Sequence, residues 1–507
     1  MTEILLDSAG LAFEPVNLLL VFVGAVLGTL FGATPGISAT LTIALMVPVT
    51  FGMTPVHGLS FLGGAYCGAI YGGSISSILI NVPGTPAAVA TMMDGYELTK
   101  KGRAGFALGG AITASFFGGQ IGTIVLLVAA PLVAAAALNI RSAEFFWIVV
   151  FAMSTVGAIG GGSVTKGLIS AFIGLILGTV GTHPFTGSLR FTFGVQGLYE
   201  GFPVIVGIVG LFSISQVLYL CHGKGMDKQI DIPTVGSLWP GWVEIMKVKA
   251  TYIRSAIIGT FVGVLPGAGA DIASFIGRNE AHRFSRNPDE YGKGSYEAVV
   301  GSEAANNAVV GGSLVPMLTL GIPGNAVSAA LIGGLLIHGM LPGPRLFTDQ
   351  AHIIYPFILS LFAANLFFAL AAFGGLKYLA KVVLIPQGVL ASVVAILSVL
   401  GAYSYRNMID DLWIMLFLGI VGYVLRRTGF PLAPIILGII LGPLAETNLE
   451  RVMTIANARG MTLMGYFMSN TLTIVLMVMS IAALIYSVVR EIRHQRSGKA
   501  LMPLETD

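Results

Sequence analysis

Long apolar stretches dominate the chain, and short polar stretches separate them. Apolar segments run over residues 17–51, 57–94, 104–130, 143–162, 167–182, 203–221, 255–277, 298–340, 353–376, 383–404, 412–425, 429–444 and 462–489. A helix needs about 20 apolar residues to cross the hydrocarbon layer, so some of these segments are long enough for more than one crossing. The pattern therefore predicts an all-α polytopic membrane protein with about 12 membrane segments.

Composition points to the same class. Hydrophobic residues make up 55% of the 507 positions and charged residues only 10%, whereas soluble chains carry about 25% charged residues. Too little polar surface remains to cover a water-soluble globule of this size. A soluble enzyme, a disordered protein and a nucleic-acid-binding protein are therefore excluded.

Basic residues cluster between the apolar segments and suggest how the chain is divided. Short loops rich in Lys and Arg stay on the cytoplasmic side, and such residues gather in the polar stretch that follows residue 222 and near the C-terminus. The predicted domains are an N-terminal extension (1–16), a first membrane repeat (17–222), a cytoplasmic linker (223–254), a second membrane repeat (255–489) and a cytoplasmic tail (490–507).

Two motifs recur in the same order in the two halves. Residues 28–39, GTLFGATPGISA, match residues 259–270, GTFVGVLPGAGA, at both Gly-Thr starts, the next Gly, the Pro-Gly pair and the final Ala. Further on, Gly-Gly-Ser at 72–74 and at 311–313 each precede a Pro-Gly pair, with spacings that differ by one residue. The order indicates a duplication. The charges around the copies favour inverted repeats, although an even number of crossings over 57–94 would remove the inversion.

Pro-Gly pairs interrupt four apolar segments, at 35–36, 83–84, 266–267 and 323–324. Pro removes a backbone donor and clashes with the preceding turn, so a helix is expected to break there. Broken backbone in lipid is tolerated only against protein or a watery cavity. Paired discontinuous or re-entrant helices are therefore a pointer to a binding site near the membrane midplane. Tight helix packing through small residues is the alternative reading of these motifs.

The residues at the breaks are suited to binding an anion. Helix N-termini direct free N–H groups and a positive dipole end at such a ligand, and hydroxyl or amide side chains can add hydrogen bonds. The predicted substrate-binding residues are Thr34, Pro35, Gly36, Ser38, Gly73, Ser74, Asn81, Gly84, Thr85, Gly267, Gly269, Ser313, Gly324 and Asn325.

Asp271, Asn306 and Asn307 are the predicted ligands of a coupling cation, and no other cofactor is expected. Asp271 follows the third break in a segment otherwise free of acids, and ionisable groups at membrane depth are functional candidates by default. A helix cap is the alternative for Asp271. Glu303 lies on one helical face with the two Asn residues, where it could line the cavity, bind the cation or anchor a loop.

Motifs of enzymes are missing from the sequence. It contains no G-x-x-x-x-G-K-[ST] phosphate loop, no G-x-S-x-G and no H-E-x-x-H, which are signatures of ATP hydrolysis, serine hydrolases and zinc proteases. The sequence therefore predicts that the chain is not an enzyme.

The motifs together resemble those of the large membrane subunit of the tripartite tricarboxylate transporter family. The resemblance covers roughly residues 10–490 and rests on residues 32–36, 71–74, 81–86, 265–270 and 303–308. It implies a secondary transporter of the bacterial inner membrane with elevator-like transport and scaffold domains. The implied partners are a small membrane subunit and a periplasmic solute-binding protein. The implied activity is uptake of an organic carboxylate such as citrate, driven by Na⁺ or H⁺. A passive anion channel or a scaffold subunit of a membrane complex is the alternative.

Overall fold

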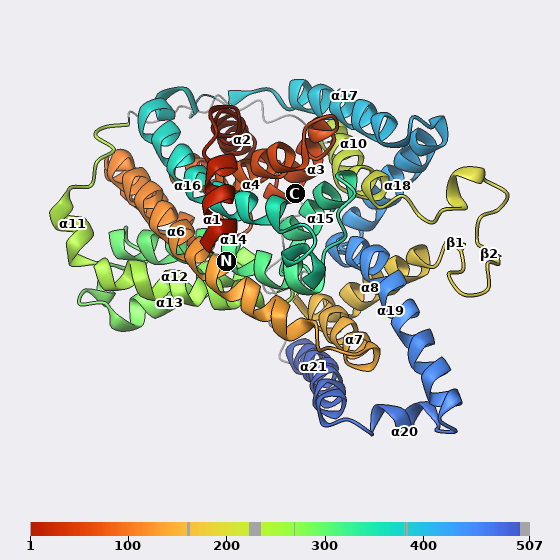
Figure 1. The fold of residues 1–507 in the computed structure, drawn as a ribbon. Helices are drawn as coiled ribbons and strands as arrows, with labels where there is room; N and C mark the ends of the chain where they lie inside the picture. Colours follow the sequence, from red (N-terminus) through yellow and green to blue (C-terminus); the bar gives the residue numbers. More distant parts are fainter. Residues whose placement is uncertain are drawn as a thin grey trace. The chain divides into compact units, whose positions relative to one another are not determined.

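The computed structural model of the chain describes residues 2–159, 163–222, 235–267, 269–379, 381 and 384–496. Helices make up nearly all regular structure in these residues, which confirms the all-helical prediction. The single exception is a two-residue antiparallel ladder between β1 and β2. The chain forms two compact units, unit 1 (residues 1–134 and 219–401) and unit 2 (residues 135–218 and 402–507), and Figure 1 labels most of their helices and both strands. Each half of the sequence thus contributes to both units.

Unit 1 contains all four Pro-Gly pairs. Its elements are α1 (Thr2–Ala12), α2 (Pro15–Ala33), α3 (Ala39–Met46), η1 (Pro48–Thr50), α4 (Pro55–Ile80), α5 (Ala88–Lys100), most of α6 (Ala104–Ala137), α11 (Trp242–Lys247), α12 (Lys249–Val264), α13 (Gly269–Phe284), η4 (Pro288–Glu290), α14 (Tyr296–Leu320), α15 (Ala326–Ile337), η5 (Pro344–Phe347), α16 (Ala351–Leu379) and most of α17 (Gln387–Arg406). Every Pro-Gly pair lies between two helices, so the predicted breaks are confirmed as helix ends.

Local chemistry explains where the central helices of unit 1 begin and end. The Thr54 hydroxyl accepts a hydrogen bond from the His57 N–H at the start of α4. The Ser295 hydroxyl accepts one from the Ala298 N–H at the start of α14. Such caps satisfy a backbone donor that the helix leaves free. Both helices stop just before a break, α4 at Ile80 and α14 at Leu320, and a residue in the left-handed conformation follows each.

Glycines allow α2 and α4 to approach each other closely. A Cβ atom at Gly24 would lie 2.2 Å from the carbonyl oxygen of Phe61, and one at Gly32 would lie 2.3 Å from that of Ala69. These distances are far below van der Waals contact, so only Gly fits. The contacts advance in the same direction along both helices, which makes α2 and α4 parallel neighbours. Small residues at such spacing are typical of tight helix pairs in membranes.

The pair α12 and α14 is built in the same way. A Cβ atom at Gly259 would lie 2.1 Å from the carbonyl oxygen of Ala305, and one at Gly263 would lie 2.9 Å from that of Val309. Every residue from 58 to 79 in α4 and from 298 to 319 in α14 is buried. A helix buried on all sides shows no amphipathic pattern, so α4 and α14 form the centre of unit 1.

Unit 2 is built around α7, α8, α19 and α21. Its elements are α7 (Ser142–Ile159), α8 (Val164–Gly178), β1 (Gly181–Thr182), β2 (Leu189–Arg190), η2 (Gln196–Leu198), α9 (Val204–Ile208), η3 (Val209–Ile214), α10 (Ser215–His222, which continues into unit 1), α18 (Ile409–Arg427), α19 (Ala433–Ala458), α20 (Leu463–Phe467) and α21 (Thr471–Arg496). Gly174 of α8 and Gly438 of α19 contact the partner backbone, because a Cβ atom there would lie 2.1 Å from Ile435 O and 2.6 Å from Ala171 O.

Seven helices of the described residues are long and apolar enough to cross a membrane. They start at Pro15, Ala104, Val204, Ala351, Gly388, Ala433 and Thr471. The sequence predicted about 12 membrane segments, which is more than these seven long apolar helices. Two features explain the difference. The breaks divide several apolar segments into shorter helices, and α4 and α14 carry many Gly and Ser residues. The larger number stays a prediction.

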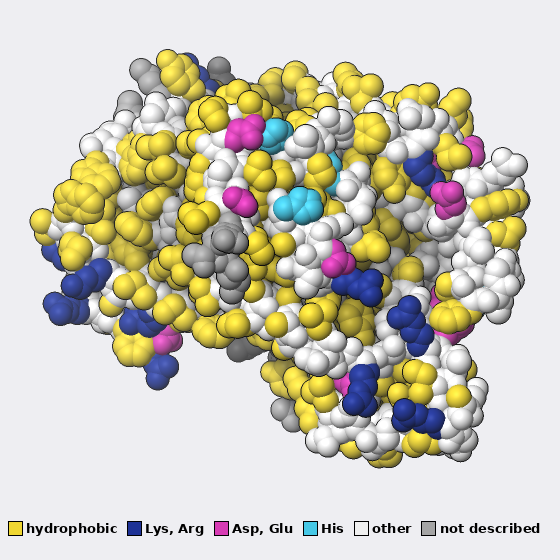
Figure 2. Space-filling model, in the orientation of Figure 1, with side chains coloured by type: hydrophobic (Ala, Val, Ile, Leu, Met, Phe, Trp, Pro, Cys, Tyr) yellow, Lys and Arg dark blue, Asp and Glu magenta, His cyan; other side chains and the backbone are white. Residues whose placement is uncertain are grey.

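Hydrophobic side chains are widespread on the surface, as expected for contact with lipid. Figure 2 shows them over most of one face, with charged side chains in small groups. Leu132, Phe172 and Trp413 are each more than 60% exposed. In a water-soluble protein a large exposed apolar surface is unusual, whereas a bilayer would cover it.

Candidate functional site

The first two breaks contact each other. A Cβ atom at Gly84, in the second break, would lie 2.5 Å from the carbonyl oxygen of Gly32 and 2.7 Å from the Cα atom of Gly73. The Gly84 N–H donates to the carbonyl of Gly73 at 3.3 Å. Gly36, in the first break, has a φ of 87°, which favours Gly. The end of α2 and the turn after α4 therefore form one compact region.

The third and fourth breaks contact each other in the same manner. A Cβ atom at Gly324 would lie 2.2 Å from the carbonyl oxygen of Gly263 and 2.8 Å from the Cα atom of Ser313. The Gly267 N–H donates to the Gly324 carbonyl at 2.8 Å. Gly267 has a φ of 81° and Gly269 one of 57°. In the second half, the non-helical turn at one break therefore hydrogen-bonds to the turn at the other. This bond satisfies a backbone N–H group that the interrupted helix leaves free.

Tyr66 joins the two pairs of breaks from the interior of α4. Its hydroxyl lies 3.0 Å from the Ser313 hydroxyl and accepts from the Asn325 side-chain amide at 2.8 Å. Asn325 also begins α15, because its Oδ1 accepts from the Ser328 N–H at 2.7 Å. All four residues are buried. Tyr66 lies between the first and second breaks in the sequence. Its hydroxyl therefore positions the side chain of Asn325, the residue that follows the fourth break.

Asp271 makes a second link between the pairs. It lies in the first turn of α13, just after the third break. Its carboxylate accepts a hydrogen bond from the backbone N–H of Ala87, which precedes α5 at the second break. Its side chain is exposed. Tyr66 and Asp271 together bring all four breaks into one region of unit 1.

The predicted substrate-binding residues differ in what they offer a ligand. The side chains of Thr34, Ser38 and Ser74 bond to backbone within their own helix or helix end. Pro35 is half-buried, while Gly36 and Asn81 are exposed. The Thr85 hydroxyl is buried and has no hydrogen-bond partner among the described residues. The structure thus brings the predicted residues together, and their role as ligands stays a prediction.

The three predicted cation ligands make separate contacts. Asp271 contacts Ala87, Asn306 lies against Glu303, and Asn307 contacts Ser115. Their role as ligands of one cation stays a prediction. The two Asn residues are fully buried on α14. The Asn307 side-chain amide donates to the Ser115 hydroxyl at 2.7 Å. That hydroxyl donates to the Glu303 carboxylate at 2.9 Å.

Several important residues of this region were not found from the sequence. Tyr66, Thr91 and Ser115 all reach α14 from elements far away in the chain, and no local motif marks them. The sequence also suggests Asp94 as a residue of the membrane boundary. In the structure, Asp94 is fully buried and pairs with Arg278 of α13 at 2.6 Å.

Replacing Tyr66 by Phe is expected to lower the free energy of unfolding by about 1–3 kcal/mol, because buried polar groups lose their partner. The substitution removes only the hydroxyl between Ser313 and Asn325. Thermal unfolding of the purified chain measures the effect. Tyr378→Phe is the matched control, since Tyr378 is 72% exposed. Equal effects of the two substitutions would contradict the bridging role of Tyr66.

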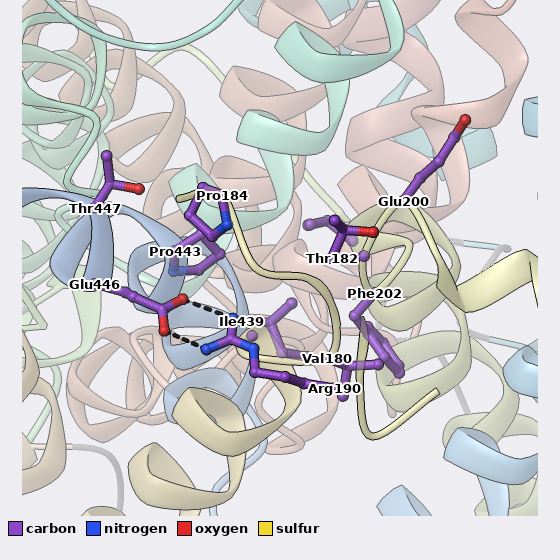
Figure 3. A pocket seen from close by; sticks show the side chains of 13 residues that line it. Val180, Thr182, Pro184, Arg190, Glu200, Phe202, Ile439, Pro443, Glu446 and Thr447 are labelled. Carbon is purple, nitrogen blue, oxygen red and sulfur yellow. Dashed lines mark hydrogen bonds and ion pairs between the residues drawn. The ribbon is translucent and has the colours of Figure 1, made fainter. Parts of the chain in front are cut away.

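A cavity of about 240 Å³ lies in unit 2 and contains none of the predicted residues. Its wall is formed by Gly178, Val180, Thr182, Pro184, Arg190, Glu200, Gly201, Phe202, Val204, Ile439, Pro443, Glu446 and Thr447. Figure 3 shows that Arg190 points at Glu446, and both carboxylate oxygens of Glu446 accept from its guanidinium. The one Arg of the cavity is therefore already paired, and an anionic substrate would have to compete with Glu446.

His183 lies beside this cavity with Glu446 and Glu450, a combination that can bind metals. The His183 Nδ1 atom accepts from the N–H groups of Phe185 and Thr186, at 3.3 and 3.1 Å. Its Nε2 atom must then carry the proton in the neutral ring, and it lies 2.6 Å from Glu450. A protonated nitrogen cannot bind a metal. The cluster is better described as a set of polar contacts between the loop after β1 and α19.

Comparisons with known proteins give one family model and two relatives that match the chain. A model of the tripartite tricarboxylate transporter TctA family matches residues 18–437. The chain is 36% identical over 496 residues to an uncharacterized 52.8 kDa protein in the TAR-I ttuC' 3' region of Agrobacterium vitis, covering 97% of this chain and 98% of that protein. It is also 36% identical over 238 residues to an uncharacterized protein in the TAR-II ttuC' 3' region of the same organism, covering 47% of this chain and 97% of that protein. No solved structure matches.

Proposed function

Because the chain belongs to the tripartite tricarboxylate transporter TctA family as its large membrane subunit, we propose that it imports an organic carboxylate driven by a cation gradient. The family is a transporter family, so the chain is a multi-pass membrane transport protein and not an enzyme. A tricarboxylate or dicarboxylate such as citrate is the proposed substrate class, and Na⁺ or H⁺ the proposed coupling ion.

The substrate would bind where the four breaks converge. The observation that supports this most is the pairing of broken backbone, Gly84 against Gly32 and Gly324 against Gly263. The helices α3, α5, α13 and α15 all begin directly after a break, and helix N-termini favour anions. The buried Thr85 hydroxyl without a partner adds hydrogen-bonding capacity there.

A duplicated core is part of the proposal. Asn81 and Gly321, the left-handed residues that follow α4 and α14, are 240 positions apart. Gly84 and Gly324 have the same offset of 240, and they make equivalent contacts. The same offset of 240 relates the buried stretches of the two helices, which are residues 58–79 in α4 and 298–319 in α14. The equal offset over α4, α14 and the turns that follow them supports the predicted domains 17–222 and 255–489 as repeats, although the first motifs, 28–39 and 259–270, are 231 positions apart. Inversion of the two stays a proposal.

The two compact units suggest how transport would occur. We propose that unit 1, which carries all four breaks, is the moving transport domain of an elevator, and that unit 2 is the scaffold. The 1–16 extension, the 223–254 linker and the 490–507 tail would lie outside the repeats. The bacterial inner membrane is the proposed location, with a small membrane subunit and a periplasmic solute-binding protein as partners.

Uptake by the reconstituted complex tests the function. Proteoliposomes with all three proteins are expected to accumulate labelled carboxylate under an inward cation gradient and to stop when an ionophore removes the gradient. Asn81→Ala and Asn306→Ala are expected to reduce uptake while still assembling with the small subunit. Equilibration without accumulation would indicate a passive anion channel instead. Accumulation that follows ATP and ignores ion gradients would contradict the proposal.

A further inference from the structure

Glu303 is a carboxylate buried in the centre of unit 1. It lies in the interior of α14 and has no exposed surface. Two other fully buried carboxylates, Asp94 and Asp411, each pair with an Arg. No Lys, Arg or His among the described residues pairs with Glu303. A buried charge without a counter-charge is strongly unfavourable, so something else must balance this carboxylate when it is ionised.

Neutral groups hold both oxygens of the carboxylate in place. The Thr91 hydroxyl of α5 donates to one oxygen, and the Ser115 hydroxyl of α6 donates to the other at 2.9 Å. Thr91 is itself 3.0 Å from the Ser302 hydroxyl. These donors fix the position of Glu303 but bring no positive charge. Each carboxylate oxygen keeps a free lone pair.

Further oxygen atoms near Glu303 lack a partner. The side-chain oxygens of Asn306 and Asn307 are buried and accept no hydrogen bond from a described residue, and the buried side-chain nitrogen of Asn306 likewise has no such partner. The side chain of Asn306 lies against the Glu303 carboxylate. The Tyr71 hydroxyl of α4 is also buried and has no hydrogen-bond partner in the described part of the chain. Buried polar atoms are normally satisfied, so this group of oxygens requires an explanation.

We propose that Glu303, Asn306 and Asn307, with the Tyr71 hydroxyl, form a binding site for one dehydrated monovalent metal cation such as Na⁺. Carboxylate, amide and hydroxyl oxygens are the ligands that hard cations take. A single carboxylate balances a single positive charge. A proton on Glu303 would neutralise the carboxylate, but it could satisfy only one of the amide oxygens. Asp271, in contact with Ala87, is not included in this proposed site.

The inference rests on the proposed cation-coupled uptake and names the ion site for it. The cluster includes residues of α4, α5, α6 and α14. α5 begins at the second break and α14 ends at the fourth. A cation at Glu303 would therefore hold together elements that border breaks of both halves, and its loss would loosen them.

Thermal unfolding of the purified chain in detergent tests the site without substrate or gradient. NaCl is varied against choline chloride at constant ionic strength. The unfolding midpoint of the wild type is expected to rise with the logarithm of Na⁺ concentration, as for a ligand that binds only the folded state. Glu303→Gln is expected to abolish this rise. Glu144→Gln is the matched control and is expected to keep it. Glu144 is a buried carboxylate in unit 2, and its oxygens accept from the backbone N–H of Arg141 and from the side chains of Asn470 and Thr473.

Asn306→Ala is the second variant, since Glu303→Gln could impair folding. The Asn306 oxygen accepts no hydrogen bond from a described residue, but the side chain lies against the Glu303 carboxylate. A small fall of the midpoint without Na⁺ is therefore expected. The Na⁺ concentration for half-maximal stabilisation is expected to rise at least about tenfold. This is the rise expected if the loss of one coordinating oxygen weakens Na⁺ binding by about 1.4 kcal/mol. A purely structural role of Asn306 would instead lower the midpoint equally at all Na⁺ concentrations.

The failures of the two proposals are distinguishable. A wild-type midpoint that ignores Na⁺, or follows only pH, would overturn the metal site even if gradient-driven uptake is observed. A Na⁺ response that persists in both Glu303→Gln and Asn306→Ala would also overturn it. Na⁺ stabilisation that depends on Glu303 in a protein that accumulates no carboxylate would support the site and contradict the proposed function alone.

Discussion

Replacing Asp94 by Ala is expected to lower the free energy of unfolding by about 3–5 kcal/mol, the effect of removing one partner of a buried ion pair. Asp94 has no exposed surface, and the Arg278 guanidinium donates to it through Nε at 3.1 Å and Nη2 at 2.6 Å. The other carboxylate oxygen accepts from the N–H groups of Gly292, Gly294 and Ser295. The Ala variant leaves a guanidinium that is only 11% exposed and three backbone donors without the partner that Asp94 supplied. Chemical or thermal unfolding of the purified chain measures the loss.

Two variants make the result interpretable. Arg283→Ala removes an exposed ion pair, 3.9 Å from Glu280 with Arg283 75% exposed, and is expected to change stability by less than about 1 kcal/mol. Asp94→Asn keeps the volume and one acceptor oxygen, so an intermediate loss is expected. An Asp94→Ala protein as stable as the Arg283→Ala protein would show that the network around Asp94 contributes little.

Gly324→Ala and Gly84→Ala are expected to reduce carboxylate uptake about 100-fold or more, because a displacement of about 1 Å at a site of close geometry has an effect of that order. The added methyl group would lie 2.2 Å from Gly263 O at Gly324 and 2.5 Å from Gly32 O at Gly84. Since both obstacles are backbone atoms, the broken segments must move apart. Initial rates of uptake by the reconstituted complex measure the change.

Gly374→Ala is the matched control for these two variants. Gly374 lies in α16 of unit 1, and a Cβ atom there would meet nothing within 4 Å. Ala is favoured over Gly inside a helix by about 0.5–1 kcal/mol, so this variant is expected to be at least as stable as the wild type and to transport normally. Normal uptake by Gly84→Ala or Gly324→Ala would contradict the proposed role of the paired breaks.

The sequence predicted those features of the fold that depend on local chemistry. Helices end at all four Pro-Gly pairs, because Pro and Gly act on the backbone in their own neighbourhood. Gly36 and Gly267 occupy the same place in the two copies of the first motif, and both have left-handed backbone. The all-helical architecture likewise follows from the length of the apolar segments.

Features that depend on distant contacts were not predictable in this way. The motif match pairs Gly73 with Gly312, but the contacts pair Gly72 with Gly312: Cβ atoms there would lie 2.5 Å from Thr29 O and 2.2 Å from Thr260 O. A shift of one residue is invisible in a short Gly-rich motif, whereas a helix interface fixes it. The same holds for Asp94, whose partner is 184 positions away in the chain.

The glycine contact between α2 and α4 has a mechanical consequence. Two helices whose backbones touch without intervening side chains can neither slide nor rotate against each other, since close-packed interiors change between discrete arrangements and do not deform gradually. The pair is expected to behave as one rigid rod during a transport cycle. Structural change would then be concentrated in the short turns at residues 34–38 and 81–87, which lie between helices.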